Sequence, residues 1–138
     1  MAAQAYDKTR ELFLDGQIDL RAVNVKAVLV LTGGGHYVVN AATHQFLSDI
    51  SAGDRVAFSP NLSGKTTTGG VFDASDFTFT SVAAGPACGA IVFYVDTGVA
   101  GTSALISYHD DYAGLPVTPN GGDINVTLDN GANRIFKF

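Results

Sequence analysis

The chain has 138 residues, of which 46% are hydrophobic and only 15% are charged, and its 8 basic and 13 acidic side chains give a net charge of −5. This composition suits one globular domain over residues 1–138 and argues against a disordered tail or a coiled coil, which need more charge. The basic residues are scattered and the net charge repels phosphate, so direct binding to nucleic acid or to an anionic membrane surface is not expected.

The amino-acid composition favours strands and tight turns. Of the 13 acidic residues all but Glu11 are Asp, which prefers turns and caps, and 16 residues are Gly. Cys88 is the single cysteine, so an internal disulfide and a multi-cysteine zinc site are excluded. A lone cysteine fits a protein that matures in a reducing compartment such as bacterial cytoplasm.

The first fifty residues contain the expected helices. Residues 1–5 are small and without periodicity, and we expect a flexible N-terminal arm there. A short helix is predicted from Asp7, as its cap, through Asp15, with Gly16 ending it. A second short helix is predicted to start at Thr43 and to turn its apolar side chains, those of Phe46, Leu47 and Ile50, inward.

Most of the remaining chain alternates in the period of two that is typical of strands. Val23, Val25, Ala27, Leu29 and Leu31 are expected on one face of the first strand, and Val28 and Val30 on the other. The other predicted strands are Tyr37–Val39, Arg55–Phe58, Phe77–Phe79, Ala90–Val95, Ala104–Tyr108, Ile124–Leu128 and Ile135–Phe138. The pattern predicts a mainly β, single-domain antiparallel β-sandwich, a jelly roll of about eight strands with one or two short helices near the N-terminal half.

The sequence offers no catalytic, cofactor-binding or metal-binding motif. His109-Asp110-Asp111 has suitable metal ligands but no known metal-loop spacing, and its role stays open. The elbow motif of serine hydrolases is missing, and Cys88 lies among small residues that favour a packing role. We therefore expect neither an enzyme nor a cofactor.

Both ends of the chain carry aromatic and apolar residues, although chain termini are usually polar. These residues are Tyr6 and Phe13 near the start and Ile135, Phe136 and Phe138 at the finish. Such side chains belong either to the core or to a contact surface.

Several segments resemble small structural proteins of tailed bacteriophages. The segments are Tyr6–Lys8, Ala42–Ile50, Gly69–Asp76, Gly114–Asp123 and Asp129–Phe138. The resemblance spans nearly the whole chain and is most specific in the last 25 residues. It points to the capsid cement, or decoration, proteins, a family that includes the jelly-roll cement protein of a Bordetella phage.

The resemblance implies a structural virion protein with no catalytic residues. Such a protein binds the outer capsid surface and stabilises the joints between subunits of the major capsid protein, its partner. We expect a homo-oligomer, with a dimer favoured over a trimer. Contacts with the capsid or with another copy are predicted for Ala2, Ala3, Gln4, Tyr6, Arg134, Phe136 and Phe138.

Two other functions remain open from the sequence. One is a β domain of the phage tail tube or tail tip, which would form rings. The other is a small carbohydrate-binding or hydrolytic jelly roll, with a concave site, an aromatic platform and convergent Asp side chains drawn from Asp73, Asp76, Asp96, Asp110 and Asp111.

Overall fold

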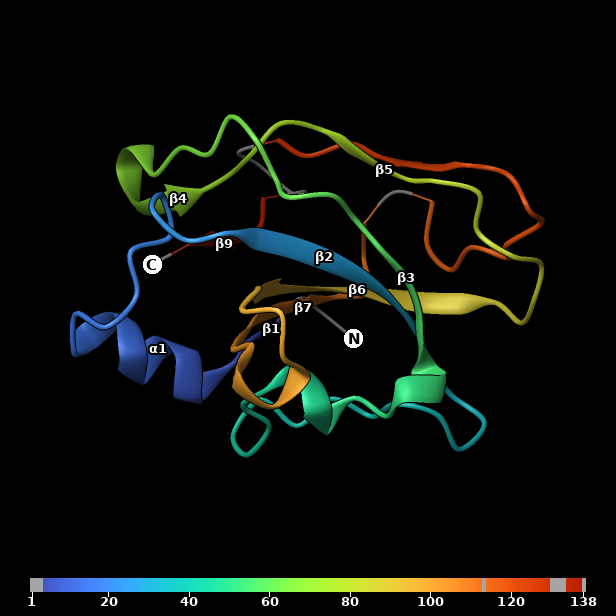
Figure 1. Ribbon diagram of the computed structural model, residues 1–138, viewed down its shortest axis with the longest axis horizontal. Helices are drawn as coiled ribbons and strands as arrows, with labels where there is room; N and C mark the ends of the chain where they lie inside the picture. The colour runs from blue at the N-terminus through green and yellow to red at the C-terminus, as the bar shows by residue number, and fades with distance from the viewer. Residues whose placement is uncertain (1–3, 113, 130–133, 138) are drawn as a thin grey trace.

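A computed structural model of the protein describes residues 4–112, 114–129 and 134–137 (Figure 1). The described chain is mainly β, with one α-helix. The strands are β1 (Gln4–Ala5), β2 (Val25–Leu31), β3 (Arg55–Phe58), β4 (Val71–Phe72), β5 (Phe77–Phe79), β6 (Cys88–Val95), β7 (Leu105–His109), β8 (Ile124–Val126) and β9 (Phe136–Lys137). The helix is α1 (Asp7–Leu14), and the 3-10 turns are η1 (Leu47–Asp49), η2 (Ala52–Asp54), η3 (Thr68–Gly70) and η4 (Ala100–Thr102).

Five strands form one antiparallel sheet in the order β1-β7-β6-β2-β3, and the pairs β4-β9 and β5-β8 form two small sheets. Strands β2 and β6 pair along their whole lengths at the centre of the large sheet. Both small sheets lie over one face of the large sheet, while α1 and the turns η1 and η2 lie towards the other (Figure 1). The prediction of a mainly β, antiparallel domain is confirmed.

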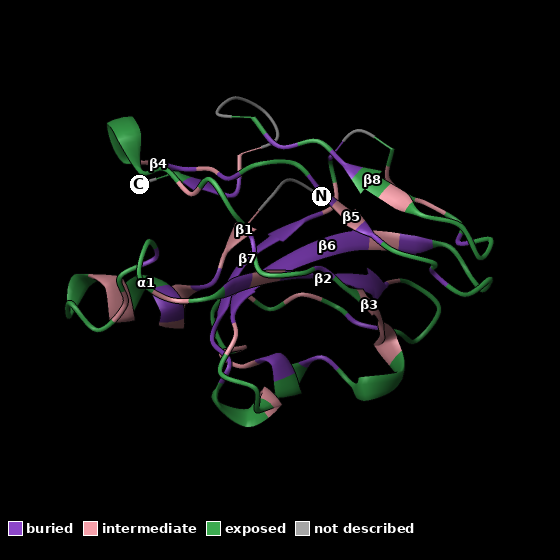
Figure 2. Ribbon diagram, turned by 45° about the horizontal axis from the view of Figure 1, so that its top comes forward, coloured by how far each residue is buried: buried purple, intermediate pink, exposed green. Residues whose placement is uncertain are grey.

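The two faces of the large sheet are buried in two separate clusters. Val25, Ala27 and Leu29 of β2 pack beneath the small sheets in the first cluster. Val28 and Val30 pack in the second cluster, beneath the loops and η1. The predicted alternation along β2 is therefore confirmed, and β2, β6 and β7 are buried along nearly their whole lengths (Figure 2).

A bulge at Gly89 lets β6 change which residues face the first cluster. Val30 pairs with Ala90, but Leu31 pairs with Cys88, so Gly89 is the extra residue. A Cβ atom on Gly89 would lie 2.1 Å from Oγ1 of Thr32, so any larger residue here would require the Thr32 side chain to move. The bulge turns Cys88 into the first cluster, where its thiol is buried.

Helix α1 lies close to its predicted position. Asp7 is its first residue, and Tyr6 rather than Asp7 occupies the capping position. The side chains of Arg10 and Asp7 form an ion pair in the first turn. After Asp15 the chain leaves the helix through Gly16, which has a φ of +71° that favours glycine.

The second predicted helix is only the 3-10 turn η1. Leu47 and Ile50 are buried as expected, but Thr43 does not begin a helix. The carboxylate of Asp49 accepts hydrogen bonds from the backbone N–H groups of Gln45 and Phe46, at 2.7 and 3.0 Å. These bonds cap the start of η1, and the turn ends after three residues because Ile50 has extended backbone angles, with φ −96° and ψ 117°.

Two further expectations differ from the structure. The predicted strand Tyr37–Val39 is absent, and only Tyr37 forms an isolated bridge, with Thr32. At the start of the chain, Gln4 and Ala5 pair with Tyr108 and Ser107 of β7. The sequence predicts a flexible arm over residues 1–5. Residues 4 and 5 instead form a strand at the edge of the large sheet, and residues 1–3 lie outside the described residues.

Candidate functional site

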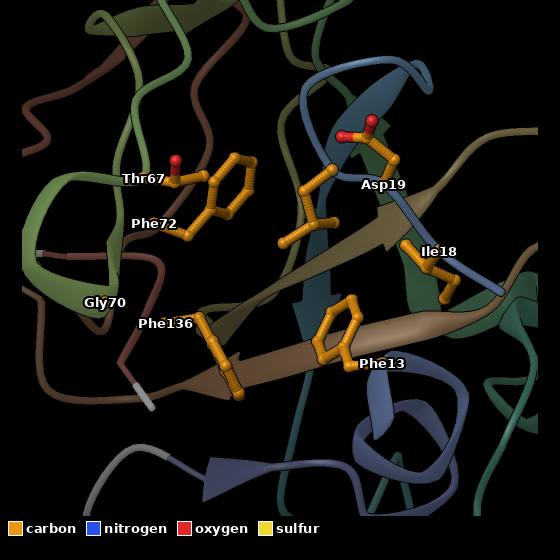
Figure 3. Close-up of a pocket in the computed structure, with 8 residues that line it drawn as sticks. Phe13, Ile18, Asp19, Thr67, Gly70, Phe72 and Phe136 are labelled. Carbon is orange, nitrogen blue, oxygen red and sulfur yellow. The ribbon is translucent and has the colours of Figure 1, made fainter. Parts of the chain in front are cut away.

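An apolar groove lies between the end of α1 and the small sheet β4-β9, and it encloses about 340 Å³ (Figure 3). Its lining comes from distant parts of the sequence. The lining residues are Phe13, Ile18, Asp19, Leu20, Thr67, Gly70, Phe72 and Phe136.

Aromatic rings form the base of the groove. Phe72 of β4 pairs with Phe136 of β9, and both side chains are at least 93% buried. The ring of Phe13 from α1 lies 5.5 Å from that of Phe136, measured between centroids, at an angle of 59°. This tilted contact ties α1 to the end of the chain and leaves part of Phe13 exposed to the groove.

The rim of the groove carries little polarity. Asp19 is the charged residue of the lining, and its carboxylate accepts a hydrogen bond from the N–H of Arg21 at 3.1 Å. Gly70 has a φ of +76° and presents only backbone to the groove. The groove therefore has the chemistry to bury apolar side chains of another molecule rather than to transfer protons.

Of the residues that line this groove, the sequence predicts only Phe136 as a contact residue. Phe13 is one of the aromatic residues near the chain start, Phe72 lies within the resembling segment Gly69–Asp76 without a predicted role, and Ile18 has no signal in the sequence. Their contribution depends on β4 pairing with β9, which joins residues more than sixty positions apart. No local pattern reports such a pairing.

The structure moves Tyr6 from the contact surface to the core. Its side chain is fully buried, and its hydroxyl is 2.8 Å from that of Tyr37. The Tyr37 hydroxyl also lies 2.8 Å from Nδ1 of His44. Burial raises the pKa of Tyr6 far above its ordinary value and that of Tyr37 to about 12. Tyr6 is thus unavailable as a contact residue in this conformation.

The other predicted contact residues differ in position. Gln4 is partly exposed in β1, while Ala2, Ala3 and Phe138 lie outside the described residues. Phe136 is 7% exposed and lines the groove. Arg134 is partly exposed, and its carbonyl accepts a hydrogen bond from the Tyr112 hydroxyl at 2.6 Å.

His109 is a buried structural residue. Its Nε2 atom is 2.9 Å from the carbonyl oxygen of Ile135 and 2.8 Å from Oγ of Ser107. A carbonyl only accepts, so Nε2 carries the hydrogen and cannot remove a proton from Ser107. Burial lowers the pKa of His109 to about 4, so the ring is neutral at pH 7. It stacks on Tyr112 with centroids 4.4 Å apart and holds the segment before β9.

Cys88 and two of the candidate aspartates are also held by burial or by a polar partner, whereas Asp73 and Asp110 each have one buried carboxylate oxygen without a hydrogen bond in the described part of the chain. Burial raises the pKa of the Cys88 thiol, which keeps it protonated and fits the predicted packing role. Asp96 pairs with Lys26 at 3.2 Å, and Asp76 accepts a hydrogen bond from the N–H of Leu128 at 2.8 Å. Within the described ranges, no group of three His, Cys, Asp or Glu side chains is placed to hold a metal ion.

No family model matches the chain, and no curated protein matches it. In the described part of the chain, no helix combines the length and hydropathy that crossing a membrane requires.

Proposed function

We propose that this protein is a structural part of a tailed-phage virion, a cement protein on the outer surface of the capsid. In this role it binds across the joints between major capsid subunits and strengthens the shell without chemistry. The resemblance of residues 114–123 and 129–138 to phage structural proteins supports the proposal that the protein belongs to a phage virion. The apolar groove between α1 and β4-β9 is the observation that carries the proposed binding.

The groove supports binding through shared surface. Fully burying one apolar side chain is worth roughly 1.5–3 kcal/mol, so a single such contact is weak. A protein that engages two sites on a closed lattice gains about 10²- to 10⁴-fold from effective concentration. A shallow apolar groove is therefore sufficient when many copies sit on one shell. The net charge of −5 suits the outer face, away from packaged DNA.

The strand pairing supports a jelly-roll sandwich as the finer description of the fold. Strands β6 and β7 pair, then β5 with β8, then β4 with β9, so the pairs are nested in sequence. Between them, Val82 bonds to Gly121 and Gly122, and Cys88 bonds to Val117. A jelly roll has this nested pairing, because it consists of one long hairpin folded over itself.

The proposal is tested with empty shells of the phage that encodes the chain. Full-length protein is added to shells that lack it, and occupancy and heat resistance of the shells are measured. Ile18→Asp places a charge in the groove and should lower occupancy about tenfold, because the carboxylate loses water on binding. Val38→Asp is the matched control, since Val38 is 72% exposed, lies outside α1 and the small sheets, and does not line the groove.

The outcomes separate the proposed functions. A wild-type protein that neither binds shells nor raises their heat resistance contradicts the cement role. A native mass corresponding to a dimer agrees with a clamp across two subunits. Rings or filaments in solution would instead favour the tail-tube function.

A further inference from the structure

A second groove lies on the opposite face of the large sheet from the small sheets. It runs over β2, β3 and β6 between the turns η1 and η4 and encloses about 520 Å³. Its lining is both apolar and charged. The lining residues are Lys26, Leu47, Arg55, Phe58, Tyr94, Asp96, Gly98, Val99, Ala100 and Ser103.

Two exposed apolar side chains belong to this mixed groove. Phe58 at the end of β3 is 47% exposed, and Val99 before η4 is 60% exposed. The Phe58 ring meets that of Tyr94 edge to face, with centroids 6.5 Å apart at 85°. Because Tyr94 is buried, this contact holds the Phe58 ring in place and leaves part of it open to solvent.

The charges of the mixed groove do not balance. Lys26 is paired with Asp96 at 3.2 Å. Arg55 donates from Nε to the carbonyl of Ile50 at 2.9 Å, which fixes the guanidinium and leaves its two terminal nitrogens as donors. Among the described residues, no carboxylate lies within ion-pair distance of Arg55. The groove thus has one excess positive charge on a protein whose net charge is −5.

The groove also borders a strand edge. Strand β3 ends the order of the large sheet, and its inner side pairs with β2. The N–H of Ser59 bonds to the carbonyl of Ala27, so the backbone groups of the preceding residue, Phe58, point away from β2. An outward N–H and C=O beside a groove are what an extended peptide needs to add a strand.

We propose that the mixed groove binds an extended segment of a partner protein. The segment pairs with the free edge of β3, places a carboxylate against Arg55, and seats an apolar side chain between Phe58 and Val99. Charge complementarity selects an acidic segment, since Arg55 has no ion-pair partner in the part of the chain that the structure describes. The inference rests on the proposed structural role, and it gives that role a second contact surface, on the other face of the sheet from the apolar groove.

The test uses a displayed library of random 12-residue peptides selected on the full-length protein. Fluorescein-labelled copies of the selected peptides are then titrated with wild type and variants. We expect a shared carboxylate next to an apolar residue, and roughly tenfold weaker binding to Arg55→Gln, which loses a charge-assisted hydrogen bond. Arg21→Gln, an equal charge change at an exposed position outside the groove, should bind like wild type.

A pair of substitutions at Val99 guards against misfolding, because this side chain is exposed. Val99→Asp should weaken binding about threefold and Val99→Lys should strengthen it by about the same factor, through repulsion and attraction of the peptide carboxylate. A loss of structure would shift both variants in the same direction, so opposite signs report the charge of the ligand.

The remaining outcomes are decisive. Selected peptides without carboxylates, or equal binding to Arg55→Gln, overturn the inference. Binding to a glycan array that depends on Arg55 and Phe58, without peptide binding, assigns the groove to a sugar instead. Equal binding of wild type and Arg55→Gln to shells overturns this inference but leaves the proposed cement function standing. Peptide binding by a protein that does not bind shells contradicts the proposed function but not the groove.

Discussion

The two faces of the large sheet are packed with different aromatic residues. The face beneath the small sheets buries five phenylalanines, those at positions 72, 77, 79, 93 and 136, together with Tyr112. The opposite face buries four of the five tyrosines, those at positions 6, 37, 94 and 108. With the exception of Tyr112, the buried rings of phenylalanine and tyrosine are thus sorted by whether they carry a hydroxyl.

The covers of the two faces explain this sorting. Strands cover the first face, and strands that pair satisfy their own backbone groups, so a purely apolar ring fits there. Loops and 3-10 turns cover the second face and bring polar groups towards the sheet. There the hydroxyls of Tyr6 and Tyr37 form a chain to His44. A buried hydroxyl needs such a partner, whereas a phenylalanine does not.

The largest expected effect comes from removing a ring on the phenylalanine face. Phe93→Ala deletes a fully buried side chain that contacts Phe77, His109 and Tyr112 edge-on. We expect the free energy of unfolding to fall by about 3–5 kcal/mol, from lost burial and the cavity left behind. Urea denaturation measures this loss, and Val38→Ala, at a 72% exposed position, should change stability by less than about 0.5 kcal/mol. A loss below about 1 kcal/mol for Phe93→Ala would show that this face is not the main core.

The next effect is acid sensitivity of the phenylalanine face through His109. Its pKa is about 4 in the folded protein, against an ordinary value of 6.5. The unfolded chain therefore gains a proton as the pH falls from about 6.5, while the folded protein does not until about pH 4. Stability should be full above pH 6.5 and decrease by about 3 kcal/mol down to pH 4.

His109→Gln should remove most of this pH dependence, because Gln keeps a donor for the Ile135 carbonyl but does not titrate. Wild-type protein measured over the same pH series is the reference. Chemical denaturation at a series of pH values measures both slopes. An unchanged slope in His109→Gln would remove His109 from this explanation.

The smallest effect belongs to the tyrosine face. Tyr6→Phe keeps the ring but deletes the hydroxyl that lies 2.8 Å from that of Tyr37. Tyr37 keeps its contact with His44, so we expect a loss of only about 0.5–1.5 kcal/mol in thermal or urea unfolding. A change of zero would mean that the hydroxyls on this face are incidental and that the sorting of rings needs another cause.

Local pattern was sufficient to predict the central strands. The alternation from Val23 to Leu31 and the apolar run Ala90–Val95 placed β2 and β6 within a few residues of their bounds. Strand β3, Arg55–Phe58, has the predicted bounds. In such segments a side chain's neighbours two positions away share its face, so burial is visible in the sequence.

Features that depend on distant pairing were not predictable. Gln4–Ala5 is too short to show periodicity, and it is a strand only because β7 lies beside it. The apolar groove depends on β4 meeting β9, and the role of His109 depends on the carbonyl of Ile135. The aromatic residues near the chain ends allowed both core and contact roles, and only tertiary structure assigns Tyr6 to the core.

The central claim is that the protein acts through surface shared with a neighbour on a phage shell. The most direct measurement is a cryo-electron microscopy map of intact virions of a tailed phage whose genome carries this sequence. The account predicts density for this domain on the outer surface of the capsid, over joints between major capsid subunits, with α1 and the β4-β9 sheet facing a subunit. Density for the domain in the tail, or its absence from the particle, would contradict the account.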